Sequence, residues 1–214
     1  MRGGEGTPAS VRARTPATPP LPRPPDTGGN PSYDFTYSIL LPLLLFLPVF
    51  IGGSITVDSL TEEIDRGTLE LLRVAPVTLT EIVEGKLLAA AAITPIQAVA
   101  WMTLLEFNGT PIANLPWLVL LVAGATVVVI VLGVTLAIAT PDRRVAQTLY
   151  SLLTLGLFGM TALSPLSPIN AAARLAIDTP SPASYVTSVA AAVVAVVWLI
   201  GVRSVVPWER VLGE

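Results

Sequence analysis

The sequence predicts an all-α protein, a polytopic transmembrane helical bundle with five visible spans. Of its 214 residues, 52% are hydrophobic and only 13% are charged, and the mean hydropathy is +0.72. A water-soluble globular protein does not have this composition. Five separate stretches lack Asp, Glu, Lys and Arg, and each is long enough to cross a hydrocarbon core of about 30 Å as a helix. The predicted spans are residues 38–57, 87–105, 116–139, 145–163 and 185–202.

Residues 1–32, which precede the first span, are predicted to be a disordered tail rich in proline and glycine. They contain eight of the chain's prolines and five glycines, with almost no large apolar residue. They therefore cannot bury enough surface to offset an ordering entropy of about 1–2 kcal/mol per residue. The tail also lacks the apolar stretch of a secretory signal peptide. The membrane domain is accordingly predicted to comprise residues 33–214.

The loop after the first span, residues 58–86, is predicted to begin as an amphipathic helix on the membrane surface. At 100° per residue, its apolar side carries Leu60, Ile64, Gly67, Leu71 and Ala75, and its charged side carries Asp58, Glu62, Glu63, Asp65, Arg66, Glu70 and Arg73. Leu69 lies among the charges, where a residue offered to a soluble partner would be. An ordinary interfacial loop is the alternative interpretation.

Local signals in the same loop predict where its helices begin and end. Thr68 can cap a second short helix after Gly67. Pro76 ends this helix, because proline lacks an amide proton and disfavours a helical conformation in the residue before it. Thr78 and Glu81 have the spacing of a capping box, which would set the angle at which the chain re-enters the membrane.

The spans themselves carry few polar side chains, and they contain no Asp, Glu, His or Lys. Ion-driven transporters generally place such groups within the membrane, so the sequence argues against that class. We expect the polar residues to bond between helices, with the lining of a path as the alternative. They are Thr94, Gln97, Thr103, Gln147, Thr148, Ser151 and Thr154. Between the last two spans, residues 170–178 are predicted to form a short re-entrant or surface helix capped by Asn170.

The Lys and Arg residues of the loops predict the orientation of the chain. One side carries Arg66, Arg73, Lys86, Arg143, Arg144, Arg203 and Arg210, whereas the two loops on the other side, residues 106–115 and 164–184, carry only Arg174. By the positive-inside rule, the C-terminus is cytoplasmic, and five spans then place the N-terminal tail outside. Because the tail carries four Arg and no export signal, we expect a further span upstream of it. Six helices would put both ends inside.

The absence of Cys and His excludes several classes of catalytic site. A thiol nucleophile, a Ser-His triad, a zinc site of the HExxH type and the usual ligation of haem or iron–sulfur clusters all require one of these residues. We therefore predict no catalytic residue, no metal site and no cofactor. The net charge is −3 and no basic patch is present, so a nucleic-acid partner is not expected.

Residues 62–86 resemble the cytoplasmic signature of type-2 ABC transporter permeases, which runs roughly E-x-x-x-G-T-L-E-x-L-L-x-x-P-V, then E-I and G-K. The matching positions are Glu63, Gly67, Thr68, Leu69, Glu70, Leu71, Leu72, Pro76, Val77, Glu81, Ile82, Gly85 and Lys86. The resemblance implies that this loop forms a coupling helix on a separate ABC ATP-binding subunit. The expected coupling residues are Glu63, Gly67, Thr68, Leu69, Glu70, Leu72, Arg73 and Pro76, with Thr78 and Glu81 as the cap of the re-entering helix.

The resemblance covers the chain from about Tyr33 to its end. Over this range it consists of the order and spacing of the spans. It implies the permease subunit of an ATP-driven transporter in a prokaryotic plasma membrane. Its expected partners are the ATP-binding subunit, a second copy or a related permease, and membrane lipid. The chain has no GxxxxGK[ST] motif, so ATP hydrolysis would belong to another polypeptide.

The chain departs from the family in one respect, because these permeases usually have six helices and the usual first one is lacking here. The alternative function is a non-transporting membrane scaffold or sensor that recruits a cytoplasmic protein through residues 58–86.

Overall fold

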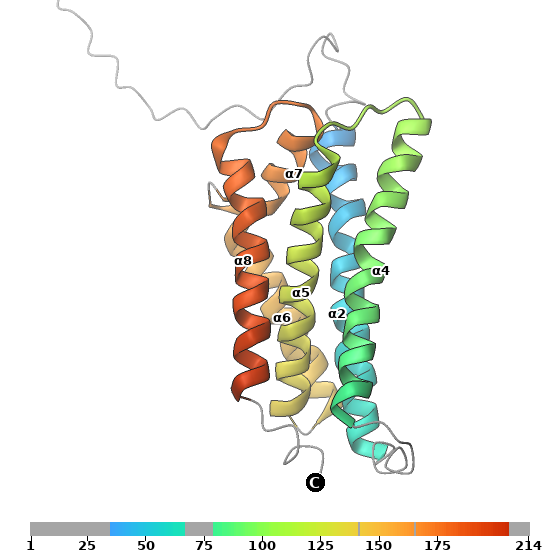
Figure 1. The fold of residues 1–214 in the computed structure, drawn as a ribbon, viewed down its shortest axis with the longest axis vertical. Coiled ribbons are helices and arrows are strands. Elements are labelled where there is room, and N and C mark those ends of the chain that lie inside the picture. The colour runs from blue at the N-terminus through green and yellow to red at the C-terminus, as the bar shows by residue number, and fades with distance from the viewer. Residues whose placement is uncertain (1–34, 67–78, 141, 165, 206–214) are drawn as a thin grey trace, which may run out of the picture.

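The structure is a computed structural model, and it describes residues 35–66, 79–140, 142–164 and 166–205. Within these residues every regular element is a helix and there is no strand, as the sequence predicts. The five long helices run side by side, and the short helix α7 lies at one end of them (Figure 1). The elements are η1 (Thr36–Leu40), α2 (Leu41–Arg66), α4 (Leu79–Phe107), α5 (Leu115–Ala139), α6 (Arg143–Ala162), α7 (Pro168–Ala176) and α8 (Pro182–Val205).

Five segments of the described chain are long and apolar enough to cross a membrane. They are Thr36–Ile64, Leu87–Phe107, Leu115–Ala139, Arg143–Ala162 and Pro182–Gly201. The prediction of five spans is therefore confirmed, and four of the five agree closely with the expected ranges. The first is longer than expected, because it runs beyond residue 57.

The helix α2 continues without a break to Arg66, so the predicted end of this helix at residue 57 is wrong. The sequence predicts the boundary at Asp58 because this is the first charged residue after the apolar stretch. In the structure this part of α2 remains packed, since Leu60 is buried against α5 and the Thr61 hydroxyl donates a hydrogen bond of 2.8 Å to the Val57 carbonyl. The first part of the predicted surface helix is therefore the last part of α2. The remainder of it lies outside the described residues.

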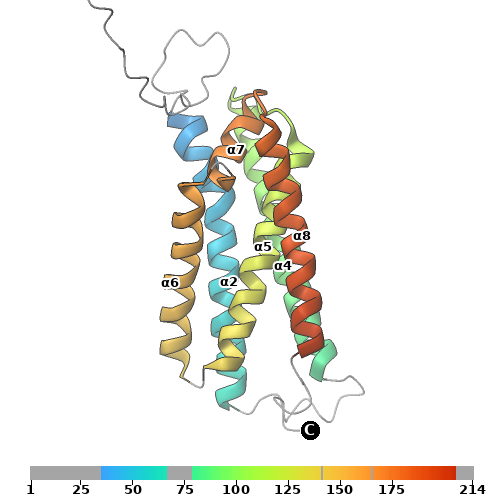
Figure 2. The same cartoon turned by 90° about the vertical axis from the view of Figure 1, so that its left-hand side faces the viewer.

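The helix α5 forms the centre of the bundle and packs against α2, α4, α6, α7 and α8. Its sequence is apolar on every side, which is typical of a helix that is surrounded by others. Leu118, Leu121, Val122, Val129 and Val134 are almost completely buried. Figures 1 and 2 show α5 between α2 and α8, with α6 on the other side of α2 in the second view. The position of α5 therefore sets the positions of the other spans.

Two glycines allow neighbouring helices to approach α5 closely. A Cβ atom on Gly124 would lie 2.7 Å from the carbonyl carbon of Ala191 and 2.8 Å from the amide nitrogen of Ala192, so the backbones of α5 and α8 are in contact there. A Cβ atom on Gly53 of α2 would overlap the Tyr150 hydroxyl of α6 and a methyl group of Val129. Small residues at helix crossings are the usual means of close packing within a membrane.

The short helix α7 covers the end of the bundle opposite the C-terminal end of α2 (Figure 1) and contacts η1, α2, α5, α6 and α8. It begins at Pro168 and not at Asn170 as predicted. Its N-cap is Ser167, whose hydroxyl accepts a hydrogen bond of 3.4 Å from the Asn170 amide, so the capping role predicted for Asn170 is wrong. The reason is local, because proline is favoured at the first helical position and serine at the cap before it.

The loop between α4 and α5 holds the C-terminal end of α7. The Asn114 side-chain amide donates to the Leu175 carbonyl at 3.1 Å and to the Asp178 carboxylate at 3.0 Å, and the Ala113 amide donates to the Ala176 carbonyl at 2.9 Å. These bonds satisfy carbonyls that the last turn of a helix leaves without an intrahelical partner. The loop thereby joins α7 to the start of α5.

The polar residues of the spans bond between helices less often than predicted. The Gln147 side chain of α6 accepts a hydrogen bond of 3.3 Å from Ser54 of α2, which connects two helices. In contrast, four hydroxyls donate to the carbonyl four residues earlier in their own helix, and these belong to Thr94, Thr103, Thr148 and Ser151. The interhelical prediction is wrong for these four, because a Ser or Thr hydroxyl within a helix reaches its own backbone first.

Candidate functional site

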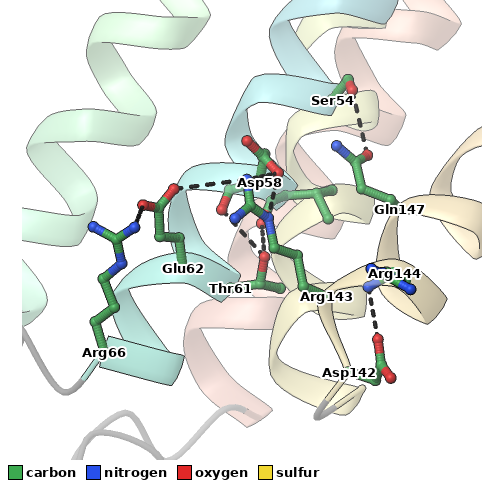
Figure 3. A network of polar contacts seen from close by, with 10 residues as sticks. Ser54, Asp58, Thr61, Glu62, Arg66, Asp142, Arg143, Arg144 and Gln147 are labelled. Carbon is green, nitrogen blue, oxygen red and sulfur yellow. Dashed lines mark hydrogen bonds and ion pairs between the residues drawn. The ribbon is translucent and has the colours of Figure 1, made fainter.

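The candidate site lies at the end of the bundle where α2 ends and α6 begins, which we call the charged end. This end is opposite α7 (Figure 1). Two carboxylates of α2, Asp58 and Glu62, meet Arg143 at the start of α6, and Arg66 of α2 pairs with Glu62 (Figure 3). The charged end adjoins residues 67–78, the segment that carries most of the sequence signature.

Arg143 binds two carboxylates of α2. Its Nε and Nη2 atoms lie 2.7 and 2.6 Å from Oδ1 of Asp58, and its Nη2 atom lies 3.7 Å from Oε2 of Glu62. The other oxygen of Glu62 pairs with Nη2 of Arg66 at 2.8 Å. The four residues therefore form a continuous line of alternating charge, Asp58, Arg143, Glu62 and Arg66, which we call the charge chain.

Local sequence explains why these side chains meet. Asp58, Glu62 and Arg66 are spaced by four residues, so they lie on one face of α2. On α6, the Asp142 carboxylate caps the helix, accepting hydrogen bonds of 2.7 Å from the Arg144 amide and 3.3 Å from the Val145 amide. This cap makes Arg143 the first residue of α6, in the tight turn that follows α5.

The charge chain is partly open to solvent, which limits its effect on stability. The side chains of Arg143 and Asp58 are 42% and 39% exposed. Ion pairs at that exposure are typically worth about 0.2–1 kcal/mol because water screens them. Two donors of one guanidinium on the same carboxylate nevertheless restrict the relative position of the two helices. The charge chain therefore acts as a positional link between α2 and α6 more than as a source of stability.

Few of the site residues expected from the sequence lie in the described part of the chain. Glu63 does, and its carboxylate accepts a hydrogen bond of 3.3 Å from Ser59 on the side of α2 that faces α4. Glu81 lies in the first turns of α4, which begins at Leu79. The remaining expected residues fall outside the described ranges, and they are Gly67, Thr68, Leu69, Glu70, Leu72, Arg73, Pro76 and Thr78.

Sequence reasoning did not assign a site role to Arg143 or Asp58. In the sequence, Arg143 indicates the orientation of the chain, and Asp58 belongs to a charged helix face. The sequence signal that could have paired them is weak. Arg143 is a positive charge beside the short turn between α5 and α6, and Asp58 is a negative charge near the end of α2. The 85 residues that separate them give no local pattern.

Comparison of the chain with known proteins gives a match to one family model. A family model described as ABC-2 family transporter protein matches residues 6–209. No curated protein and no solved structure matches the chain. The matched range includes every described helix and also residues 67–78, which continue from the charge chain.

Proposed function

Because the chain belongs to the ABC-2 family of transporter proteins, as the signature in residues 62–86 predicts, we propose that it is the permease subunit of an ATP-driven transporter. Membership makes the chain the membrane component of a transporter. We further propose that a separate ATP-binding subunit hydrolyses ATP and that the charged end receives the resulting movement. The observation that carries this proposal is the charge chain, which connects the end of α2, next in sequence to residues 67–78, with the start of α6.

The charge chain offers a physical route from the partner to the spans. Arg66 is the residue next to the segment 67–78, so a displacement of that segment acts directly on the end of α2. Arg143 would carry the same displacement to α6, since its guanidinium is bound to Asp58 and Glu62. Both helices also pack against α5, so the bundle would respond at two spans together.

The contact with the ATP-binding subunit is proposed to use the residues of the sequence signature. Leu69 supplies an apolar side chain for a cleft in the partner, and the charged residues around it contact the rim of that cleft. The proposed contact residues are Glu63, Gly67, Thr68, Leu69, Glu70, Leu72, Arg73 and Pro76, and Thr78 with Glu81 would cap the re-entering helix. A second copy of the chain, or a related permease, would complete the transporter.

Co-purification in a mild detergent tests the proposed function. The chain, extracted from its native membrane, should elute with a polypeptide that carries ATP-binding motifs, and ATP hydrolysis should accompany the complex. Recovery of a different cytoplasmic partner without ATPase activity would contradict the proposal and support the scaffold or sensor function.

We propose that the charged end faces the cytoplasm, which accessibility of single cysteines can test. The natural chain has no Cys, so each introduced thiol is the only one. In intact cells an impermeant maleimide should label the Thr179→Cys variant, beside α7, and should label the Arg144→Cys variant only after permeabilisation. Both positions are exposed. The opposite pattern, or labelling of both from outside, would contradict the orientation.

Charge reversal at Arg143 should uncouple the permease from its ATPase with little loss of stability. In the Arg143→Glu variant three carboxylates face one another, so the link between α2 and α6 is lost. We expect the ATPase activity of the reconstituted complex to fall about tenfold, within the usual range of coupling free energies, while the unfolding free energy changes by about 1 kcal/mol or less.

Two further variants make this measurement specific. The Arg144→Glu variant changes the neighbouring, exposed arginine and should keep nearly full activity. The exchanged pair, Asp58→Arg with Arg143→Glu, should recover part of the lost activity. Equal losses in the Arg143→Glu and Arg144→Glu variants would show that the charge chain has no part in coupling.

A further inference from the structure

The helix α4 forms one edge of the bundle and leaves most of its surface uncovered (Figure 1). It packs mainly against α2 and α5, and only 17% of its most apolar stretch is buried, whereas 61% is buried in α5. The outer face of α4 therefore meets either lipid or another protein, and its side chains indicate which.

Gln97 lies on this outer face at the middle of the span. It is ten residues from each end of Leu87–Phe107, which is about 15 Å of helix on either side. Its side chain is exposed, and it forms no hydrogen bond with any residue that the structure describes. A glutamine side chain cannot reach the polar surface of the membrane from that depth, and an unpaired amide in hydrocarbon is costly. Gln97 therefore needs a hydrogen-bonding partner within the membrane.

The outer faces of α6 and α8 make no such demand. The exposed side chains of the α8 span are apolar, among them Val193, Val196 and Ile200, and lipid chains are equally apolar. On α6, the exposed Thr148 and Ser151 hydroxyls donate to carbonyls of their own helix at 2.8 and 3.0 Å, so lipid can cover them. The unmet amide therefore distinguishes α4 as the face that a protein partner covers.

Gln97 belongs to a row of exposed residues spaced alternately by four and three residues. This row, which we call the α4 row, consists of Ile93, Gln97, Ala100, Leu104 and Phe107. Its large apolar members are 61%, 56% and 86% exposed, in chain order. The alternation of four and three keeps side chains on one face of a helix, and parallel helices pack side by side by this spacing. The α4 row is about 20 Å long, so it offers a helix several turns of contact.

Two grooves border the α4 row on the side of α2. One has a volume of about 310 Å³ and includes Ile93 in its lining, and the other has a volume of about 440 Å³ and includes Leu104 and Phe107. The side-chain ridges of one helix pack into the grooves of another. A partner helix on the α4 row can therefore place side chains in both grooves, so the relief of this face suits a helix.

A second copy of the chain supplies the complement that Gln97 lacks. A carboxamide has both donors and an acceptor, so two carboxamides can bond to each other reciprocally. Two copies with the same orientation are related by a twofold axis perpendicular to the membrane, so each residue lies at the same depth in both. Contact between α4 and its copy therefore brings the two Gln97 side chains to the same level. A single polar residue within an apolar row is also what fixes the register of parallel coiled coils.

We propose that two copies of the chain pair through their α4 rows, with the two Gln97 side chains hydrogen-bonded to each other at the centre. Ala100, one turn from Gln97, lets the two backbones approach, as small residues do at helix crossings in membranes. The need for a second copy rests on the proposed function, whereas the pairing itself involves only this chain.

Thiol crosslinking in the native membrane tests which face pairs. Phe107 and Leu163 are large apolar residues at the ends of α4 and α6 nearest α7, and they are 86% and 92% exposed, but only Phe107 belongs to the α4 row. With a short bis-maleimide, the Phe107→Cys variant should give a covalent dimer of the full chain, and the Leu163→Cys variant should give at least tenfold less. Equal crosslinking of the two variants, or a crosslink from Phe107→Cys to a different polypeptide, would overturn the proposal.

Replacement of Gln97 tests the hydrogen bond at the centre. The measurement is energy transfer between labelled copies of the purified full chain in liposomes, at several ratios of protein to lipid and without any ATPase. The Gln97→Leu variant should associate about tenfold more weakly, and Gln97→Asn should keep part of the association because it retains a carboxamide.

The matched control is Thr148→Leu, which removes an exposed polar group from the outer face of α6. This variant should associate as the natural protein does, because the Thr148 hydroxyl is already bonded within its own helix. Unchanged association of the Gln97→Leu variant, or an equal loss in the Thr148→Leu variant, would overturn the proposal.

The outcomes also separate this inference from the proposed function. A chain that pairs through α4 but never co-purifies with an ATPase would support the pairing and contradict the transporter subunit. An active complex with an ATPase in which the Phe107→Cys variant does not crosslink would support the subunit and overturn the pairing. Loss of transport in the Gln97→Leu variant with unchanged association would assign the carboxamide to the transported substrate and would also overturn the pairing.

Discussion

Replacing Gly124 by valine is expected to lower the free energy of unfolding by about 3 kcal/mol. The first atom of the new side chain would lie 2.7 Å from the Ala191 carbonyl carbon and 2.8 Å from the Ala192 amide nitrogen. These are backbone atoms, so no side-chain rotation relieves the overlap and α8 must move away from α5. Overpacking of a well-packed interior typically costs about 1–3 kcal/mol, and a contact with backbone belongs at the upper end of that range.

The measurement is a denaturation curve of the purified protein in detergent, followed by helix content. Gly156→Val is the matched control, because a Cβ atom on Gly156 of α6 would have no heavy atom within 4 Å. Gly124→Ala should shift the curve in the same direction by a smaller amount. The close contact between α5 and α8 would be disproved if the Gly124→Val variant unfolded at the same denaturant concentration as the natural protein. A midpoint no lower than that of the Gly156→Val variant would disprove it as well.

The second large effect is expected at the proposed contact with the ATP-binding subunit. Leu69→Asp should weaken the association by roughly 2 kcal/mol, which corresponds to about 30-fold in affinity. The reason is that a carboxylate would have to enter an apolar cleft without a partner. The measurement is co-elution of the ATPase with the permease, together with the ATP hydrolysis of the reconstituted complex.

Two comparisons make the effect at Leu69 specific. Arg73→Glu should act less strongly, because a charge at a solvated rim contributes little to affinity. A melting curve of the permease alone should be the same with and without Leu69→Asp, as this position belongs to none of the five candidate spans. Normal assembly of the Leu69→Asp variant would exclude this side chain as the contact, and a less stable permease would show that Leu69 is packed within it.

The sequence by itself determined the five spans, the helical fold and the family. These properties depend on local quantities, namely the length of an uncharged stretch relative to the bilayer and the order of residues in a short signature. At the end of α2 the prediction was wrong because a distant partner opposed the local signal. The end of α2 was placed at Asp58 because a charge usually ends a span, yet Arg143 binds Asp58 from the start of α6.

Only the tertiary structure decided which faces of the helices meet. The pairing of Arg143 with Asp58 and Glu62 and the contact of Gly124 with α8 both depend on how one helix is rotated and tilted against another. In a helix that is apolar on nearly every side, such as α5, no periodic pattern in the sequence marks the face that will be buried. Close packing of small residues and a few polar contacts select that face, and these act between segments far apart in the chain.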